Sequence, residues 1–487
     1  MELTQIKTLG ALEKTGYVSR SIKDELRNNL IDKIKNKQPI FEGIIGYEDT
    51  VVPQLKNAIL AKHAINLLGL RGQAKTRIAR SMVDLLDEYI PVIAGSPIND
   101  DPFCPISSYG KALKAEKGAD LPIEWLHRND RFYEKLATPD VTVADLIGDI
   151  DPIKAATQKL TYADEGVIHY GMIPRANRSI FVINEIPDLQ ARIQVALFNI
   201  LQEGDVQIRG FKMRLPLDVQ FVFTANPEDY TNRGSIVTPL KDRIGSQILT
   251  HYPKSIEIAK KITQQEIIAE AKNANIYVPE IAKTLLEQIV FEARESDYID
   301  ANSGVSARMS ITMYENLMAA AEIRMLQNGE TSTSIRMADF EAILPAITGK
   351  VELVYEGEQL GSENVAYLLI GSAVKTLFDR TYRPIKKLKK PGVPDEFDAV
   401  VQWFIENSNF ELPNDANDKD YAAQLNKIKP MQAVLDEYTS EIDTREQIFL
   451  KELLLWGLVE YKQLSKRKLD QGITFEDEFL GALYGKN

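Results

Sequence analysis

The stretch Ile65-Asn-Leu-Leu-Gly-Leu-Arg-Gly-Gln-Ala-Lys-Thr76 joins a short apolar run to a glycine-bearing turn that ends in a basic residue and a hydroxyl residue. After it, Ile78, Met82 and Leu85 have the spacing of a helix. A strand, a glycine loop and a helix in this order are typical of a phosphate-binding loop, because backbone amides and the positive end of the helix attract an anion. The stretch therefore predicts a nucleotide-binding α/β fold.

The residues of this loop have distinct expected roles. Lys75 is expected to reach the β- and γ-phosphates of ATP, and the Thr76 hydroxyl is expected to bind Mg²⁺. Ala74 stands where the usual pattern has its last glycine, which costs little if its φ is negative and much if its φ is positive. The residues expected to hold the nucleotide are Gly69, Gly72, Gln73, Ala74, Lys75, Thr76 and Arg77.

A second motif, Ser179-Ile-Phe-Val-Ile-Asn-Glu185, is an apolar strand that ends in a polar pair. Glu185 is expected to orient and polarise the attacking water, while Asn184 occupies the place where an aspartate would normally hold the water shell of the magnesium. Asparagine keeps an acceptor oxygen but loses the charge. The sequence therefore predicts weak metal retention and slow hydrolysis.

Two further polar positions follow downstream strands. Asn226 ends the run that begins at Val219, and it is expected to hydrogen-bond the γ-phosphate or the water. Arg243 closes Thr238-Pro-Leu-Lys-Asp-Arg243, where a solvated surface pair of Asp242 and Arg243 is the plain alternative.

Short apolar runs alternate with helical stretches from residue 41 to about residue 253, which predicts a five-stranded parallel sheet covered by helices. The expected strands are Ile65–Leu70, Pro91–Ala94, Ile180–Ile183, Val219–Thr224 and Gln247–Thr250. The expected domains are a helical N-terminal arm (1–40), an α/β core (41–255), a helical lid (256–350), a linker region (351–392) and a helical C-terminal domain (393–487). Residues 98–138 are expected to form a surface excursion.

Composition narrows the function classes. The 487 residues suffice for about three domains. The chain has 58 Lys and Arg against 70 Asp and Glu, a net charge of −12, which makes nucleic acid an unlikely partner. The single cysteine, Cys104, excludes an internal disulfide and fits a reducing cytoplasm. Apolar runs stop far short of the ~20 residues that a bilayer requires, so no membrane association is expected. The basic run at 386–390 favours a solvated linker.

Several stretches together resemble the helix-2-insert branch of the AAA+ ATPases over about residues 41–350. Leu146-Ile-Gly-Asp-Ile-Asp151 and Gly166-Val-Ile-His-Tyr-Gly-Met-Ile-Pro-Arg-Ala-Asn177 are similar to the magnesium chelatase ATPase subunit. Ala196-Leu-Phe-Asn-Ile-Leu-Gln-Glu-Gly-Asp-Val-Gln207 and Phe223-Thr-Ala-Asn-Pro227 are similar to MoxR-type ATPases.

The resemblance implies a P-loop AAA+ core with a helix-2 insert at about 148–178 and a hairpin at about 204–216. It implies that Asn226 is sensor 1, Arg243 an arginine finger directed at a neighbour's nucleotide, and Arg308 sensor 2 of the lid. It also implies ATP and Mg²⁺ as cofactors, a homo-oligomeric ring such as a hexamer, and a partner protein with a von Willebrand factor A domain. A remodelling ATPase is the main expectation. A non-catalytic, nucleotide-dependent assembly scaffold is the alternative favoured by Asn184, and a helicase-like motor is disfavoured by the negative charge.

Overall fold

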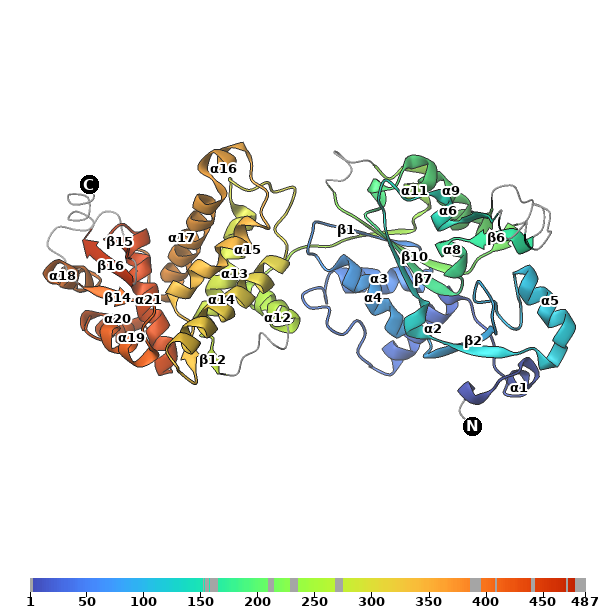
Figure 1. The fold of residues 1–487 in the computed structure, drawn as a ribbon, viewed down its shortest axis with the longest axis horizontal. Helices are drawn as coiled ribbons and strands as arrows, with labels where there is room; N and C mark the ends of the chain where they lie inside the picture. Colours follow the sequence, from blue (N-terminus) through green and yellow to red (C-terminus); the bar gives the residue numbers. More distant parts are fainter. Residues whose placement is uncertain are drawn as a thin grey trace. The chain divides into compact units, whose positions relative to one another are not determined.

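The computed structural model describes residues 3–151, 153, 157, 165–208, 214–227, 235–267, 275–385, 396–407, 410–438, 443–469 and 472–477. Contacts divide the chain into two compact units between His251 and Tyr252 (Figure 1). All of the site residues expected from the sequence lie in the first unit except Arg308, which lies in the second.

The first unit is built on a five-stranded parallel sheet, as the sequence predicts. Its strand order is β11-β1-β10-β7-β4, and each strand runs parallel to its neighbours. The strands are β1 (Ile65–Leu68), β4 (Phe132–Leu136), β7 (Ser179–Asn184), β10 (Val219–Ala225) and β11 (Ser246–Leu249). The order places the strand of the phosphate loop, β1, next to β10, which leads to Asn226.

Alternate residues of the central strands pack against helices on the two faces of the sheet (Figure 1). Val182 and Val222 face one cluster with α2 (Ile22–Lys35), α3 (Val51–Leu60) and α4 (Lys75–Ser81). Phe181 and Phe223 face the other cluster with α8 (Met172–Arg175), α9 (Ala191–Glu203) and α11 (Thr238–Arg243). Burial on both faces explains why these strands are continuous apolar runs.

One expected sheet strand was wrong. The run Pro91–Ala94 falls in β2 (Tyr89–Ile93), which pairs antiparallel with β3 (Ile123–His127) in a separate two-stranded sheet. The fifth strand of the core is instead β4, inside the 98–138 segment that was expected to be a surface excursion. This segment also contains α5 (Ser108–Lys117) and the short turns η3 (Gly118–Asp120) and η4 (Arg128–Arg131).

The N-terminal residues do not form a separate arm. They begin with η1 (Leu3–Gln5) and α1 (Leu9–Glu13), and in α2 the side chains of Leu26 and Leu30 are buried in the core of the first unit. Glu25 of α2 and Arg131 form a buried two-pronged ion pair with N···O distances of 2.7 and 2.6 Å. Such a pair fixes α2 to the segment that leads into β4.

Two hairpins lie where the family resemblance expects an insert and a hairpin. After α6 (Val143–Leu146), β5 (Gly148–Ile150) pairs antiparallel with β6 (Ile168–Tyr170), which follows η5 (Glu165–Val167). Further along, β8 (Asp205–Gln207) pairs with β9 (Arg214–Pro216). Residues 209–213 and most of 152–164 lie outside the described residues. The remaining short turns of this unit are η2 (Met82–Leu85) and η6 (Ile186–Asp188).

The second unit is mainly helical and shares one hydrophobic core. Its first part contains α12 (Ile256–Glu266), β12 (Ile276–Tyr277), α13 (Glu280–Glu295), α14 (Arg308–Gln327), β13 (Thr333–Ser334), η8 (Met337–Ile343), α15 (Leu344–Thr348), α16 (Tyr355–Leu360) and α17 (Ser362–Thr381). Its last part contains α18 (Asp398–Glu406), β14 (Glu411–Pro413), α19 (Asp418–Leu425), α20 (Pro430–Tyr438), α21 (Thr444–Glu460), β15 (Leu464–Leu469) and β16 (Gly472–Asp477). Within the described ranges, no helix is both long enough and apolar enough to span a bilayer.

The region 351–392, which was expected to be a linker, contains the helices α16 and α17 up to Thr381. There α17 packs against α13 and α21, and Val365, Leu369 and Leu377 are buried in the shared core. The basic run at 386–390 lies outside the described residues. The last part is not wholly helical either, because β14, β16 and β15 form an antiparallel sheet in that order.

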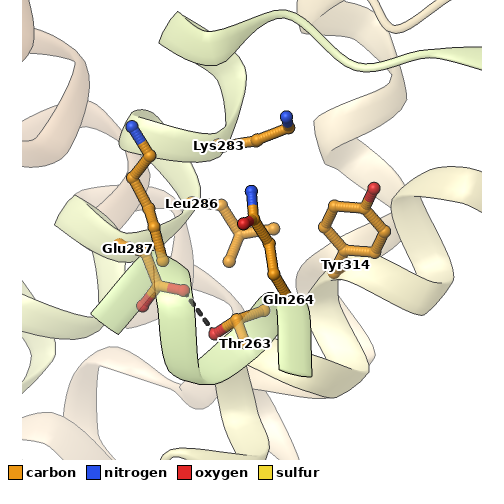
Figure 2. Close-up of a pocket in the computed structure, with 7 residues that line it drawn as sticks. Thr263, Gln264, Lys283, Leu286, Glu287 and Tyr314 are labelled. Atoms are coloured by element: carbon orange, nitrogen blue, oxygen red, sulfur yellow. Dashed lines mark hydrogen bonds between the residues drawn. The ribbon is translucent and has the colours of Figure 1, made fainter. Parts of the chain in front are cut away.

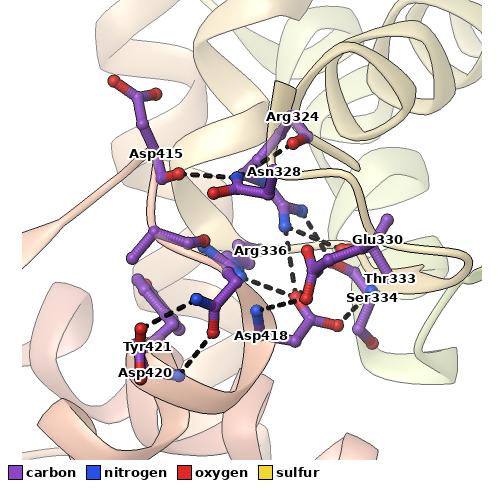
Figure 3. Close-up of polar contacts among 12 residues, drawn as sticks. Arg324, Asn328, Glu330, Thr333, Ser334, Arg336, Asp415, Asp418, Asp420 and Tyr421 are labelled. Atoms are coloured by element: carbon purple, nitrogen blue, oxygen red, sulfur yellow. Dashed lines mark hydrogen bonds and ion pairs between the residues drawn. The ribbon is translucent and has the colours of Figure 1, made fainter. Parts of the chain in front are cut away.

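A buried polar cluster joins the two parts of this unit (Figure 3). Arg324 of α14 donates to Thr333 Oγ1 at 2.7 Å and to Asp418 Oδ1 of α19 at 3.2 Å. Arg336 reaches the same Asp418 oxygen at 2.6 Å. The first and last parts of the second unit are therefore joined by paired charges as well as by the shared core.

Candidate nucleotide-binding site

The predicted phosphate loop follows β1 and leads into α4, so the expected strand, loop and helix are present. At Gly69, an added Cβ would collide with the side chains of Thr250 and Gln73, so only glycine fits. Gln73 Oε1 accepts a hydrogen bond from the Thr250 hydroxyl at 2.7 Å. This contact ties the loop to the residue that follows β11.

Ala74 adopts the conformation that the sequence analysis identified as costly. Its φ is +55° and its ψ is +20°, in the left-handed region, directly before the first residue of α4. A non-glycine residue pays about 1–2 kcal/mol there. Gly72, with φ of +73°, adopts a positive φ without that cost. The loop therefore keeps the glycine-type backbone of the motif although an alanine occupies the last position.

Lys75 and Asn226 meet at the carboxyl ends of β1 and β10. The Lys75 ammonium donates to Asn226 Oδ1 at 2.6 Å, to the Leu70 carbonyl oxygen at 3.0 Å, and to the carbonyl oxygen of Gly69. Neighbouring parallel strands bring their carboxyl ends to one edge of a sheet, which is where α/β proteins bind ligands. The structure thus brings together two residues that are 151 positions apart.

Asn184 is the last residue of β7 and Glu185 follows it, at the same edge of the sheet. Asn184 Oδ1 accepts from the Thr224 hydroxyl at 3.0 Å, and the Glu185 backbone N–H donates to Thr224 Oγ1 at 3.1 Å. Glu185 has a left-handed backbone with φ of +55°. Its half-exposed carboxylate accepts no hydrogen bond from the described residues, so it is available to a water molecule.

Two residues that sequence reasoning missed touch these motifs. Glu134 of β4 accepts from Asn184 Nδ2 at 2.5 Å and from Arg80 of α4 at 2.9 Å. The Tyr47 hydroxyl lies 3.0 Å from the carbonyl oxygen of Gln73. Neither residue belongs to a motif with fixed spacing. The only signal for Glu134 in the sequence is that it is a charged residue inside the short strand Phe132–Leu136.

Arg243 and Arg308 occupy different settings. The Arg243 guanidinium donates to Gln202 Oε1 at 2.9 and 2.7 Å and to the Pro239 carbonyl oxygen at 2.7 Å, so it is held against α9 of its own chain. Arg308 is exposed, and its N–H donates to the Ser306 hydroxyl at 3.1 Å as α14 begins. The roles expected for these two arginines rest on the family resemblance alone.

The donor set suits a magnesium ion brought by a nucleotide. The Thr76 hydroxyl is exposed in the first turn of α4, and Glu185 and Glu134 offer carboxylate oxygens, which are the hard ligands that Mg²⁺ prefers. Among the residues that the structure describes, no three His, Cys, Asp or Glu side chains gather as a preformed metal site. The ion would therefore depend mainly on phosphate oxygens and water.

The hollows found in the second unit contain none of the residues expected to bind nucleotide. A cavity of about 10 Å³ lies beside Glu287, whose buried carboxylate accepts a hydrogen bond from the Thr263 hydroxyl at 2.5 Å. Figure 2 shows the residues that line it. Burial raises the pKa of Glu287. A groove of about 580 Å³ shares Lys283 and Tyr314 with this cavity and extends to Ser334 and Arg445.

A known family model matches part of the first unit. Residues 122–244 match the family model described as "AAA domain (dynein-related subfamily)". This match contains β4, β7, β10 and Arg243, and it begins after the phosphate loop.

Curated relatives extend the similarity. The chain is 29% identical over 268 residues to "Magnesium-chelatase subunit ChlI" of Nostoc sp., covering 52% of this chain and 66% of that protein. It is 29% identical over 244 residues to "Magnesium-chelatase subunit ChlI-2, chloroplastic" of Arabidopsis thaliana, covering 48% of this chain and 54% of that protein. The chain thus spans between about half and two thirds of these relatives.

Solved structures are more distant. A structure titled as the complex between subunits BchI and BchD of magnesium chelatase overlaps with a TM-score of 0.34 and 18% identity, over 66% of this chain and 99% of that chain. RuvB of Thermotoga maritima overlaps with a TM-score of 0.34 and 12% identity, over 90% of this chain and 95% of that one.

The sheet order and the loop after β1 give the first unit an α/β core of the P-loop kind, and the family match makes this unit similar to AAA+ modules. More particularly, the chain resembles the ATPase subunit of magnesium chelatase.

Proposed function

We propose that this chain binds and hydrolyses ATP with Mg²⁺ at the carboxyl edge of its first-unit sheet. The observation that carries the proposal is the contact between Lys75 and Asn226, because it joins the phosphate loop to the polar end of the neighbouring strand. The Lys75 ammonium is already directed to oxygen acceptors, and phosphate oxygens would replace them with a charged partner.

The residues of the chain would divide the work at this edge. Thr76 would hold the magnesium ion, which would neutralise charge on the phosphates when bound. Glu185 would hold and polarise the attacking water, since its carboxylate has no partner among the described residues. Asn226 would donate its amide N–H to the γ-phosphate or the water.

The proposal extends to a ring that acts on a protein partner. In it, Arg243 would leave Gln202 and reach the nucleotide of the next chain, and Arg308 would act as sensor 2 from the second unit. The similarity to magnesium-chelatase subunits supports this part of the proposal. We propose that the partner has a von Willebrand factor A domain and that the β5–β6 insert contacts it. We also propose that the chain acts in the cytoplasm.

The first test is a thermal melt with and without Mg-ATP. Lys75→Ala should abolish the stabilisation that Mg-ATP gives to the wild type, because it removes the main side-chain cation of the loop. Equal stabilisation of both proteins would contradict the assignment of the loop. Glu185→Gln should keep the stabilisation and lose phosphate release. If the wild type binds nucleotide without any phosphate release, the assembly scaffold becomes the better reading.

A further inference from the structure

Asn184 places an amide where an aspartate would normally hold the water shell of the magnesium. The structure places a carboxylate directly beside it, because Glu134 Oε1 accepts from Asn184 Nδ2 at 2.5 Å. Together the two side chains carry one negative charge, which is the charge that an aspartate alone would carry. The charge has moved from β7 to its neighbour, the edge strand β4.

The orientation of the amide follows from its two partners. Asn184 Oδ1 accepts from the Thr224 hydroxyl at 3.0 Å, so the NH₂ group faces Glu134. A carboxylate only accepts hydrogen bonds, and it therefore needs a donor at position 184. An aspartate there would place a second carboxylate against Glu134 and repel it.

The second oxygen of Glu134 points to the helix of the phosphate loop. Glu134 Oε2 accepts from Arg80 at 2.9 Å, and Arg80 lies on α4 one turn after Thr76. The Glu134 side chain is 28% exposed, so it is held in place and still reaches solvent. The carboxylate thus lies between the β7 motif and the helix that carries the expected metal ligand.

We propose, resting on the Mg-ATP site proposed above, that Glu134 supplies the negative charge that Asn184 lacks to the magnesium's water shell. Asn184 then serves as a positioning residue that holds the Glu134 carboxylate through its amide. This differs from the expectation drawn from the sequence, in which asparagine at position 184 weakens metal retention.

The competing explanation is that Glu134 only pairs with Arg80 to fix α4. Both explanations predict some loss of thermal stability in Glu134→Gln, and Arg80→Ala serves as the matched variant for that loss. The two explanations differ in the expected affinity for the metal. Only the proposed role predicts that this affinity falls in Glu134→Gln and is restored by a carboxylate at position 184.

The experiment measures the dissociation constant of Mn²⁺, used as a spectroscopic stand-in for Mg²⁺, from the full chain saturated with a slowly hydrolysed ATP analogue, by electron paramagnetic resonance. Four proteins are compared: wild type, Glu134→Gln, Asn184→Asp and the double variant. Affinity for a fluorescent nucleotide in EDTA is measured in parallel, and Arg80→Ala is included as the stability control.

We expect Glu134→Gln to weaken Mn²⁺ binding by about tenfold or more. Asn184→Asp should bind Mn²⁺ no more tightly than the wild type, and the double variant, with its single carboxylate now at position 184, should return to within about threefold of the wild type. Wild-type Mn²⁺ affinity in Glu134→Gln, or tighter binding in Asn184→Asp alone, would overturn the proposal. The fluorescent nucleotide is also titrated with Mg²⁺ present, and failure of the wild type to bind it there would overturn the Mg-ATP site itself, so the two failures are distinguishable.

Discussion

At the scale of single residues, strain is concentrated in the two motifs that carry the proposed chemistry. Ala74 ends the phosphate loop and Glu185 follows the β7 strand, and both have a φ of +55°. Backbone strain of this kind costs about 1–3 kcal/mol per residue and persists where the surroundings impose it. At Glu185 the strain coincides with a backbone N–H bonded to Thr224 and with a carboxylate that accepts no hydrogen bond from the part of the chain that the structure describes, which is a reason to connect the strain to function.

Ala74→Gly tests how much of this strain is stored in the loop. Glycine adopts the left-handed conformation without a Cβ clash, although it also loses more entropy on folding. We expect a net gain of about 0.5–1 kcal/mol in the stability of the first unit, measured by urea denaturation. Ala79→Gly, at a buried position inside α4, should instead destabilise. A loss of stability in Ala74→Gly would show that the left-handed backbone is not retained in solution.

Asp218 gives the first unit a predictable pH dependence. Burial raises the pKa of Asp218 to about 6, and its carboxylate accepts the Ile22 N–H at 2.6 Å. Because the folded pKa lies above the unfolded value of about 3.9, the stability that the protonated form contributes is lost as the pH rises from about 4 through 6. The full difference is about 3 kcal/mol.

Asp218→Asn should remove this pH dependence and keep an acceptor for the Ile22 N–H. We therefore expect the variant to gain stability relative to the wild type when urea denaturation at pH 7.5 is compared with pH 4. A stability difference that does not change between these two pH values would contradict the raised pKa.

At the scale of elements, the sequence was reliable where burial on both faces produces a continuous apolar run. This explains why β1, β7 and β10 were predicted. The edge strand β11 was also predicted, although only Ile248 of its four residues is buried. The sequence was unreliable at the edge strand β4, where Phe132-Tyr-Glu-Lys-Leu136 mixes apolar and charged residues because one side of an edge strand is open. Glu134 lies on this strand, so the same gap hid the partner of Asn184.

The same reasoning explains the linker that proved to be a helix. The expected linker region, 351–392, begins with a stretch that contains acidic residues and glycine, but Val365, Leu369 and Leu377 of α17 are buried in a core shared with helices before and after this region. Local composition indicates where turns occur. It does not indicate which helices, distant in the sequence, will pack on the apolar face of a helix such as α17. The roles proposed for Arg243 and Arg308 depend on neighbouring chains or on the arrangement of the two units, which a local sequence pattern does not encode.

The polar cluster of Figure 3 should contribute to the free energy of unfolding of the second unit, because it joins several of its elements. Arg324 is 4% exposed and contacts Asp339 Oδ2 at 3.0 Å. Arg324→Leu leaves a buried carboxylate without its charged partner, so we expect a loss of about 3–5 kcal/mol by urea denaturation. Arg445→Ala, at the exposed pair with Asp443, should cost less than about 1 kcal/mol. Similar losses in the two variants would contradict the importance of burial in this cluster.

At the scale of the whole molecule, the similarity to AAA+ proteins covers only part of the chain, and the C-terminal part lies outside the family match. The family match ends at residue 244, and the curated relatives align with about half of the chain. The C-terminal part, with its β14-β16-β15 sheet, is fused to the lid through one core. A variant that removes this part would therefore uncover the lid's apolar core, and tests of ring action require the full chain.

Action of Arg243 across a chain interface is tested by mixing two inactive full chains. A Lys75→Ala chain keeps its arginine, and an Arg243→Ala chain keeps its phosphate loop, so an interface between them can contain one complete site. In a random equal mixture about a quarter of the interfaces, one half times one half, would be complete in this way. We expect phosphate release near that fraction of the wild-type rate. Lys241→Ala, an exposed change on the same helix, should retain turnover without mixing. If mixed assemblies form, as judged by co-purification of differently tagged chains, and no ratio restores phosphate release, then Arg243 remains with Gln202 in its own chain and does not act on a neighbour.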